Sequence, residues 1–138
     1  MLNRLNCKFH HLGLACADLD REARPWLDLG YRNEAQDFED PIQKVRGRFL
    51  IGPGPRLELL TPLSVDSPIT AMIQRGVRIY HQAFEAPTFD ETIATLRAAN
   101  YKLVAGPVPA VAFEDRRIAF LVVPNLNVIE IIEKRIAD

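Results

Sequence analysis

Two histidines and two glutamates recur in this sequence at nearly equal intervals. His11 and His81 are 70 positions apart, and Glu58 and Glu130 are 72 positions apart. Two imidazoles and two carboxylates make a nitrogen and oxygen donor set that suits Ni, Co, Mn, Fe or Zn. Two carboxylates would neutralise a divalent cation, and a six-coordinate ion would keep two positions for water or substrate. These four residues are therefore candidate ligands of one metal ion.

The two glutamates differ in how strongly their neighbours point to a ligand. Val128 and Ile132 share the predicted strand face of Glu130, and the opposite face is also aliphatic. An ionised carboxylate in such surroundings is costly unless it is paired or bound to a metal. Arg56 shares the face of Glu58, so a solvated face with a salt bridge is an alternative interpretation there.

Each histidine taken alone is weak support, because a lone strand histidine is more often a partly buried residue than a ligand. His10 competes with His11, since adjacent strand residues face opposite sides. We favour His11 because an internal repeat aligns it with His81. A twofold pairing of the two copies would bring both histidines and both glutamates to one point.

The repeat covers most of the chain. HLGLACADLDREARPWLDLGYR from His11 matches HQAFEAPTFDETIATLRAANYK from His81, and FLIGPGPRLELL from Phe49 matches FLVVPNLNVIEII from Phe120. The period is longer than that of solenoid repeats, so two copies of one module are predicted.

Each copy has the pattern β-α-β-β-β, which predicts an α+β fold. The expected strands are about 7–16, 31–38, 44–51 and 56–61, then 78–86, 101–105, 117–123 and 128–133. The expected divisions are a first module at about 7–62, a linker helix at about 67–76 and a second module at about 78–134, within one domain of residues 1–138. Gly52-Pro53-Gly54-Pro55 predicts a tight hairpin connection.

The helix ends also follow local signals. Thr88 and Glu91 predict a capping box for the second helix. Asp18 is the expected N-cap of the first helix, which Pro25 should kink or delay because an interior proline removes a hydrogen bond. Gly30 and Asn100 are the expected stops.

Composition limits the possible partners. Seventeen basic and eighteen acidic residues are mixed along the chain, giving a net charge of −1 and no basic patch for nucleic acid. No apolar stretch reaches the roughly 18 residues of a membrane span, and the first residues lack the apolar core of a signal peptide, so a cytoplasmic protein is expected. Cys7 and Cys16, roughly 30 Å apart on one extended strand, are expected to be half-buried thiols and not a disulfide.

These repeated modules with His…Glu…His…Glu resemble the vicinal oxygen chelate superfamily, which includes glyoxalase I, methylmalonyl-CoA epimerase, extradiol dioxygenases and fosfomycin or bleomycin resistance proteins. The likeness is greatest to the methylmalonyl-CoA epimerase branch. It is carried by HLGLA from His11, QKVR from Gln43, LELLTPL from Leu57, DSPI from Asp66, YHQAFE from Tyr80 and VIEIIE from Val128.

The resemblance implies a cupped mixed sheet around one divalent ion (Co, Ni, Zn, Mn or Fe), often in a homodimer. His11, Glu58, His81 and Glu130 would be its ligands, and Glu130 or Glu58 the catalytic base. The implied activity is epimerisation or isomerisation through loss of a proton α to a carbonyl or thioester, possible substrates being CoA or glutathione thioesters. The alternatives are a glyoxalase I-like lactoylglutathione lyase and a non-enzymatic, antibiotic-binding protein. A dioxygenase is disfavoured because a fourth ligand would crowd oxygen.

The chain departs from the epimerase pattern in three places. Pro109–Arg117 replaces a glycine-rich stretch, and Val123-Pro124-Asn125 replaces His-Pro-Lys. Gly47 stands where one epimerase has a carboxylate proposed as a second base. These segments shape the substrate pocket, so the resemblance constrains the metal ligands more than it constrains the substrate.

Overall fold

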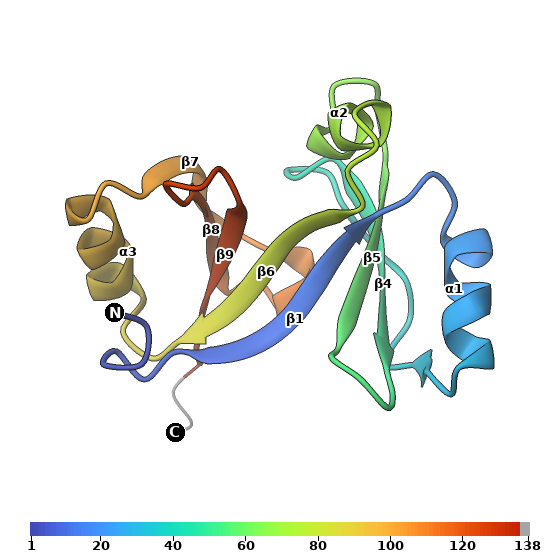
Figure 1. The fold of residues 1–138 in the computed structure, drawn as a ribbon, viewed down its shortest axis with the longest axis horizontal. Coiled ribbons are helices and arrows are strands. Elements are labelled where there is room, and N and C mark those ends of the chain that lie inside the picture. The colour runs from blue at the N-terminus through green and yellow to red at the C-terminus, as the bar shows by residue number, and fades with distance from the viewer. Residues whose placement is uncertain (136–138) are drawn as a thin grey trace. The chain divides into compact units, whose positions relative to one another are not determined.

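The computed structural model describes residues 1–135 and divides the chain into two compact units. The central unit is His11–Tyr80, and the terminal unit combines Met1–His10 with the chain from His81 onward. The first ten residues therefore group with the second copy of the repeat. The α+β class predicted from the sequence is confirmed, with three α-helices and mixed sheets (Figure 1).

The central unit has a sheet in the order β2-β4-β5-β1, and β3 also pairs with β4. Strands β1 and β5 are parallel, whereas β4 and β5 form an antiparallel hairpin across the predicted Gly-Pro turn. In Figure 1, α1 runs beside β4 and β5, and α2 lies near the end of β5. The bounds are β1 Lys8–Ala15, α1 Leu19–Asp28, β2 Arg32–Asn33, β3 Phe38–Asp40, β4 Val45–Ile51, β5 Leu57–Pro62 and α2 Pro68–Gln74.

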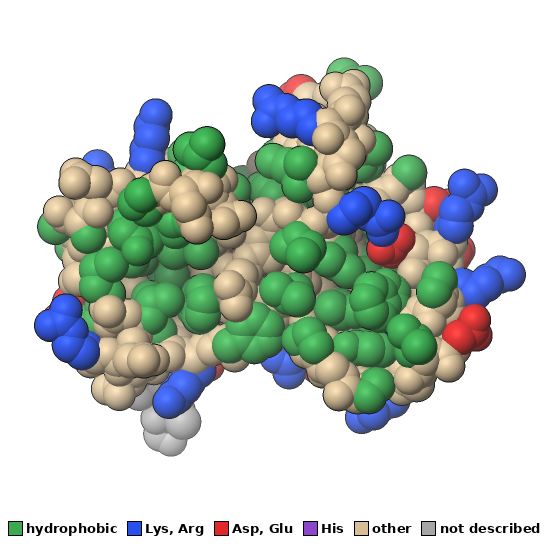
Figure 2. All heavy atoms as spheres, viewed as in Figure 1, with side chains coloured by type: hydrophobic (Ala, Val, Ile, Leu, Met, Phe, Trp, Pro, Cys, Tyr) green, Lys and Arg blue, Asp and Glu red, His purple; other side chains and the backbone are tan. Residues whose placement is uncertain are grey.

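Each face of this sheet packs against its own helix. Leu14, Leu57 and Leu59 face α1, where Leu19 and Ala23 are buried. On the other face, a smaller cluster of Ala15, Val45 and Leu60 packs with Ile69 of α2. Strand residues alternate between faces, so the residues between these contacts, including His11 and Glu58, belong to the α2 face. Apolar side chains also reach the surface on the side drawn in Figure 2.

The terminal unit has a sheet in the order β6-β9-β8-β7, with β6 and β9 parallel and the other pairs antiparallel. Helix α3 packs on one face through Phe89, Ile93 and Leu96, and Cys7 joins the same cluster. The bounds are β6 Ile79–Ala86, α3 Phe89–Ala98, β7 Lys102–Pro109, a 3-10 turn Val111–Phe113, β8 Arg117–Val122 and β9 Val128–Glu133.

Helix α1 begins where the sequence places its cap. Asp18 accepts a hydrogen bond from the Arg21 backbone N–H at 2.8 Å, and Gly30 ends the helix with φ +107°. The helix starts at Leu19 and continues through Pro25, so the predicted late start is wrong. The cap and the buried side chains of the first turns outweigh the hydrogen bond that Pro25 cannot make.

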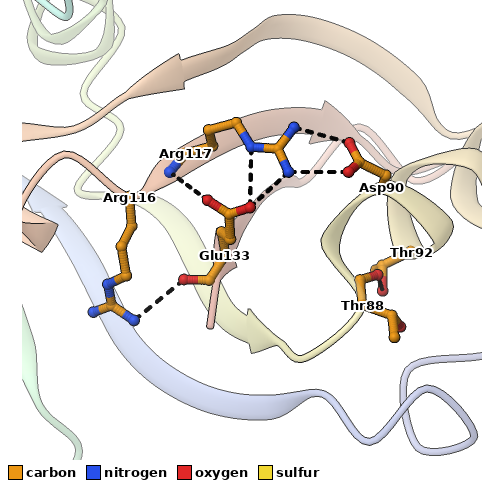
Figure 3. Close-up of polar contacts among 6 residues, drawn as sticks. All are labelled: Thr88, Asp90, Thr92, Arg116, Arg117 and Glu133. Carbon is orange, nitrogen blue, oxygen red and sulfur yellow. Dashed lines mark hydrogen bonds and ion pairs between the residues drawn. The ribbon is translucent and has the colours of Figure 1, made fainter. Parts of the chain in front are cut away.

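The predicted capping box of α3 is also wrong. Thr88 is the N-cap residue, but its side chain makes no capping hydrogen bond. Its φ of −118° and ψ of 76° lie outside the extended region that aims a capping side chain at the helix. Instead its carbonyl oxygen accepts from the Thr92 hydroxyl at 2.8 Å (Figure 3).

The strand predicted at 31–38 is divided in two. Asn33 is opposite Leu50, and Phe38 is opposite Gly47. The chain therefore moves five positions from Asn33 to Phe38 while the partner strand β4 moves only three, from Leu50 to Gly47. The two additional residues separate β2 from β3 and place Phe38 on β3. The strand predicted at 101–105 extends to Pro109, which an edge strand tolerates because one of its sides needs no N–H donors.

Other local predictions are confirmed. Helix α2 begins with a Ser67 cap that accepts from Ile69 N–H at 3.2 Å, and it ends before Gly76 at φ +70°. Cys7 and Cys16 are free thiols, but both are buried and not half-buried. Burial raises the pKa of the Cys16 thiol to about 11. Among residues 1–135, none of the helices combines the length and the apolarity that a bilayer crossing requires.

Candidate functional site

The first predicted pair lies inside the central unit. His11 stands on β1 and Glu58 on the adjacent parallel strand β5. The imidazole Nε2 is 3.1 Å from Glu58 Oε1. His11 is 0% exposed and Glu58 is 5% exposed. For Glu58 the sequence had also allowed a solvent-exposed strand face. The structure therefore excludes the solvated-face interpretation.

The second pair lies inside the terminal unit and has the same construction. His81 stands on β6 and Glu130 on the adjacent parallel strand β9, with Nε2 of the imidazole 3.2 Å from Oε1 of the carboxylate. These residues are 1% and 2% exposed. No histidine is visible on the face drawn in Figure 2. The carboxylate of Glu130 is therefore buried, as its aliphatic sequence neighbours predicted.

The two pairs share one register. In the central unit Glu58 is opposite Gly13, two residues after His11. In the terminal unit Glu130 is opposite Ala83, two residues after His81. Equal offsets on parallel strands place each carboxylate at the same point relative to its imidazole, so the sequence repeat is a structural repeat of the two pairs.

A phenylalanine ring packs edge-on against the histidine of each pair. Phe49 is opposite Glu58 on β4 and lies edge-on to His11, with ring centroids 5.4 Å apart. Phe120 is opposite Glu130 on β8 and lies edge-on to His81 at 5.3 Å. The sequence analysis assigned no role to these phenylalanines. The signal that could have found them is the repeat, because Phe49 and Phe120 are the first residues of its second pair of matching segments.

The third histidine is not part of either pair. His10 belongs to the terminal unit, and its ring lies edge-on to Phe113 with centroids 5.4 Å apart. Phe113 is the last residue of the 3-10 turn, which lies within the segment Pro109–Arg117 that replaces the expected glycine-rich stretch. The preference for His11 over its neighbour therefore agrees with the pairing to Glu58.

The donor types and their burial fit a metal ion. His11, Glu58, His81 and Glu130 are all buried and of residue types that can hold one. Two ligands at about 2.1 Å from an ion, bound at right angles, are about 3.0 Å apart, close to the nitrogen–oxygen separation within each pair. A hydrogen bond has the same length. Buried carboxylates need a positive partner, either an ion or a protonated imidazole.

Gly47 is closely covered. A Cβ atom added to it would lie 2.1 Å from Cζ of Phe38, so the Phe38 ring rests directly on the glycine backbone. The same ring stacks on Phe49 with centroids 5.8 Å apart and an interplanar angle of 28°. The position where the resemblance placed a carboxylate is therefore covered by an aromatic ring.

A network of charged side chains links strands of the terminal sheet to α3 (Figure 3). The Arg117 guanidinium donates to Glu133 at 2.6 Å and to Asp90 at 3.0 Å. Arg116 donates to the Glu133 carbonyl oxygen at 3.2 Å and to the Glu85 carboxylate at 2.8 Å. This network joins the first turn of α3 to β8 and β9 and anchors the segment that precedes β8.

Known proteins are similar to this chain in sequence. The sequence model of the glyoxalase/bleomycin resistance protein/dioxygenase superfamily matches residues 10–120. The ethylmalonyl-CoA/methylmalonyl-CoA epimerase of Cereibacter sphaeroides is 23% identical over 129 residues, which cover 92% of this chain and 93% of that protein.

Two solved structures share the fold. A hypothetical protein from Bacillus halodurans has a TM-score of 0.82 and 28% identity, over 96% of this chain and 97% of its own. The methylmalonyl-CoA epimerase of Mycobacterium tuberculosis has a TM-score of 0.78 and 27% identity, over 93% of this chain and 88% of its own. The predicted glyoxalase-like fold is thereby confirmed.

Proposed function

Because the chain belongs to the glyoxalase/bleomycin resistance protein/dioxygenase superfamily, we propose that it is a metal-dependent epimerase or isomerase. Its reaction would remove a proton from the carbon next to a carbonyl group, most suitably that of a CoA thioester. Two of the similar proteins carry the name methylmalonyl-CoA epimerase, which supports this substrate class. The observation that carries the proposal is the shared register of the two buried His–Glu pairs.

In this proposal His11, Glu58, His81 and Glu130 together hold one divalent ion, which can be Co, Ni, Zn, Mn or Fe. Support comes from the equal construction of the two pairs and from their burial. Two imidazoles and two carboxylates suit these ions, and the two negative charges balance a dication.

The ion, when bound, supplies Lewis-acid stabilisation for the negative charge that develops on the carbonyl oxygen. Glu130 or Glu58 acts as the base and accepts the α-proton on a carboxylate oxygen. Return of that proton to the opposite face of the same carbon gives epimerisation. Return to the neighbouring carbon gives isomerisation, as in a glyoxalase I-like reaction.

Burial of the glutamate base favours removal of the α-proton. A free glutamate has a pKa of about 4.3 and is a weak base toward a carbon acid. Glu58 and Glu130 are only 5% and 2% exposed, and each has a phenylalanine opposite on the adjacent strand. Exclusion of water strengthens electrostatic interactions in the site.

The test is solvent exchange on metal-reconstituted protein. In deuterated water, methylmalonyl-CoA should gain deuterium at its α-carbon, and either epimer alone should convert to a mixture of both. A parallel assay with the hemithioacetal of methylglyoxal and glutathione tests the lactoylglutathione lyase alternative. Titration of metal-free protein with bleomycin or fosfomycin tests a binding function. Absence of α-exchange in thioesters by fully loaded protein would refute the epimerase proposal.

A further inference from the structure

The α2 face of the central sheet carries an accessible aromatic surface next to a His–Glu pair. Phe49 touches His11, and Phe38 stacks on Phe49. Phe49 is buried, with 8% exposed, whereas Phe38 is half-buried and keeps accessible ring surface. We call Phe38 and Phe49 the aromatic wall. It begins at the imidazole and ends at the ring of Phe38.

The position of Phe38 depends on two features of the sequence. The two additional residues between β2 and β3 bring Phe38 opposite Gly47. Gly47 has no side chain, so the ring can lie on the strand itself. Any larger residue at position 47 would displace the ring, because even a Cβ atom would be 2.1 Å from it.

The terminal unit has no equivalent surface at the matching position. Ile118 stands two residues before Phe120, as Gly47 stands two residues before Phe49. Ile118 is opposite Ile132 and has 0% exposure, so this site is filled by its own side chain. At this matching position, within residues 1–135, the aromatic wall is therefore a departure from the repeat.

The surroundings of Glu58 are apolar on one side and charged on the other. Along β5, Leu60 follows on the same face and packs in the cluster that Phe38 joins. Arg56 precedes on that face and binds Glu34 with Nε to Oε2 at 3.1 Å. The two arginines that flank Gly47 alternate to the opposite face, where they pair with acidic residues, Arg46 with Glu39 and Arg48 with Asp37 and Asp20.

We infer that Phe38, seated on Gly47, is a specificity-determining residue that sets the size of the apolar branch on the reacting carbon of the substrate. The inference rests on the proposed function, since it takes the reacting carbon to lie beside the His11–Glu58 pair. The branch lies against the accessible side of Phe38, and the charged part of the substrate lies toward Arg56.

The inference is tested with equimolar epimer mixtures of 2-alkylmalonyl-CoA thioesters that carry methyl, ethyl, propyl or butyl branches. Such a mixture is already close to the epimerisation equilibrium, so its binding to active, metal-loaded protein can be measured by calorimetry. Deuterium exchange at the α-carbon gives kcat/KM for the same series. Phe38→Ala removes the ring, and Phe38→Leu replaces it with a smaller apolar side chain. Leu27→Ala, at an exposed position of α1, is the matched control.

One methylene in an apolar pocket changes specificity by roughly 10- to 200-fold. Relative to wild type, Phe38→Ala should therefore raise the butyl-to-methyl ratio of kcat/KM by at least about 10-fold. Phe38→Leu should give a smaller rise, Leu27→Ala should give none, and the affinities should follow the same order. Metal content should stay near one ion per chain in all variants.

Two negative results have different meanings. If wild-type protein exchanges the α-proton but neither Phe38 variant changes the branch preference, the assignment of Phe38 is wrong and the proposed function stands. If loaded wild-type protein exchanges none of the thioesters, the proposed function itself fails, and the specificity assignment fails with it.

Discussion

The carboxylate of Glu130 lies 3.2 Å from Nε2 of His81, on the parallel strand beside it. Both residues are almost completely buried. A cation that they share would join β6 to β9 directly and would lower the cost of burying the carboxylate. The same relationship between His11 and Glu58 joins β1 to β5 in the other unit.

Metal content is the first prediction. Purified protein should hold close to one divalent ion per chain, and His81→Ala should lower this several-fold because one imidazole donor is lost. An ion present at 100 times its Kd stabilises the folded state by about 2.7 kcal/mol. Chelation should therefore lower Tm by about 5–10 °C for a chain of this size. Elemental analysis and calorimetry measure both quantities.

The matched control for this measurement is His10→Ala. His10 packs against Phe113 and belongs to neither pair, so its removal should leave the metal content unchanged. Equal metal content in the His81→Ala and wild-type proteins would contradict the ligand assignment.

Loss of the base is the second prediction. Glu130→Gln keeps the shape of the side chain but removes its negative charge, so it should abolish deuterium exchange into the α-position of the thioester. Glu133→Gln, on the same strand but in the Arg117 network, should retain exchange near the wild-type rate. Glu58→Gln tests the alternative base. Wild-type exchange by Glu130→Gln would exclude Glu130 as the base.

Acid sensitivity of the Arg117 network is the third prediction. Hydrogen bonds from Arg117 hold the pKa of Glu133 and that of Asp90 below their usual values. Their stabilising effect is present above the unfolded pKa values of about 4.3 and 3.9, and it is lost as pH falls through the lower folded values. The free energy of unfolding of Arg117→Met should therefore differ from wild type more at pH 7 than at pH 3.

Urea denaturation at the two pH values measures this difference. Arg97→Met removes an exposed arginine from the last turn of α3 and should show a smaller change between pH 7 and pH 3. A constant difference between Arg117→Met and wild type across this range would show that the ion pairs contribute nothing, leaving the contact of Arg117 with the Phe89 ring.

The close contact between Gly47 and Phe38 gives the fourth prediction. Gly47→Ala places a Cβ atom within the Phe38 ring, so the ring must move, at a cost of roughly 1–3 kcal/mol of unfolding free energy. In a Phe38→Ala background the same change should cost less than half as much. A double-mutant cycle from urea denaturation measures the coupling. Additive effects would show that the two residues do not interact.

The sequence determined the repeat and the chemistry that it carries. Matching positions of His11 with His81 and of Glu58 with Glu130 were sufficient to predict the four candidate ligands, because the repeat is local information. The N-cap residues of α1 and α2, Asp18 and Ser67, were also predicted from local capping signals. The class and the order of elements followed in turn from hydrophobic periodicity.

Only the tertiary structure decided which residues meet. The register of β1 with β5 pairs His11 with Glu58, and the packing of Phe38 on Gly47 needs two additional residues between β2 and β3. The first ten residues pack with the second copy, although their sequence adjoins the first. Such contacts join residues far apart in the chain, and their energies depend on side-chain packing that a local pattern does not contain.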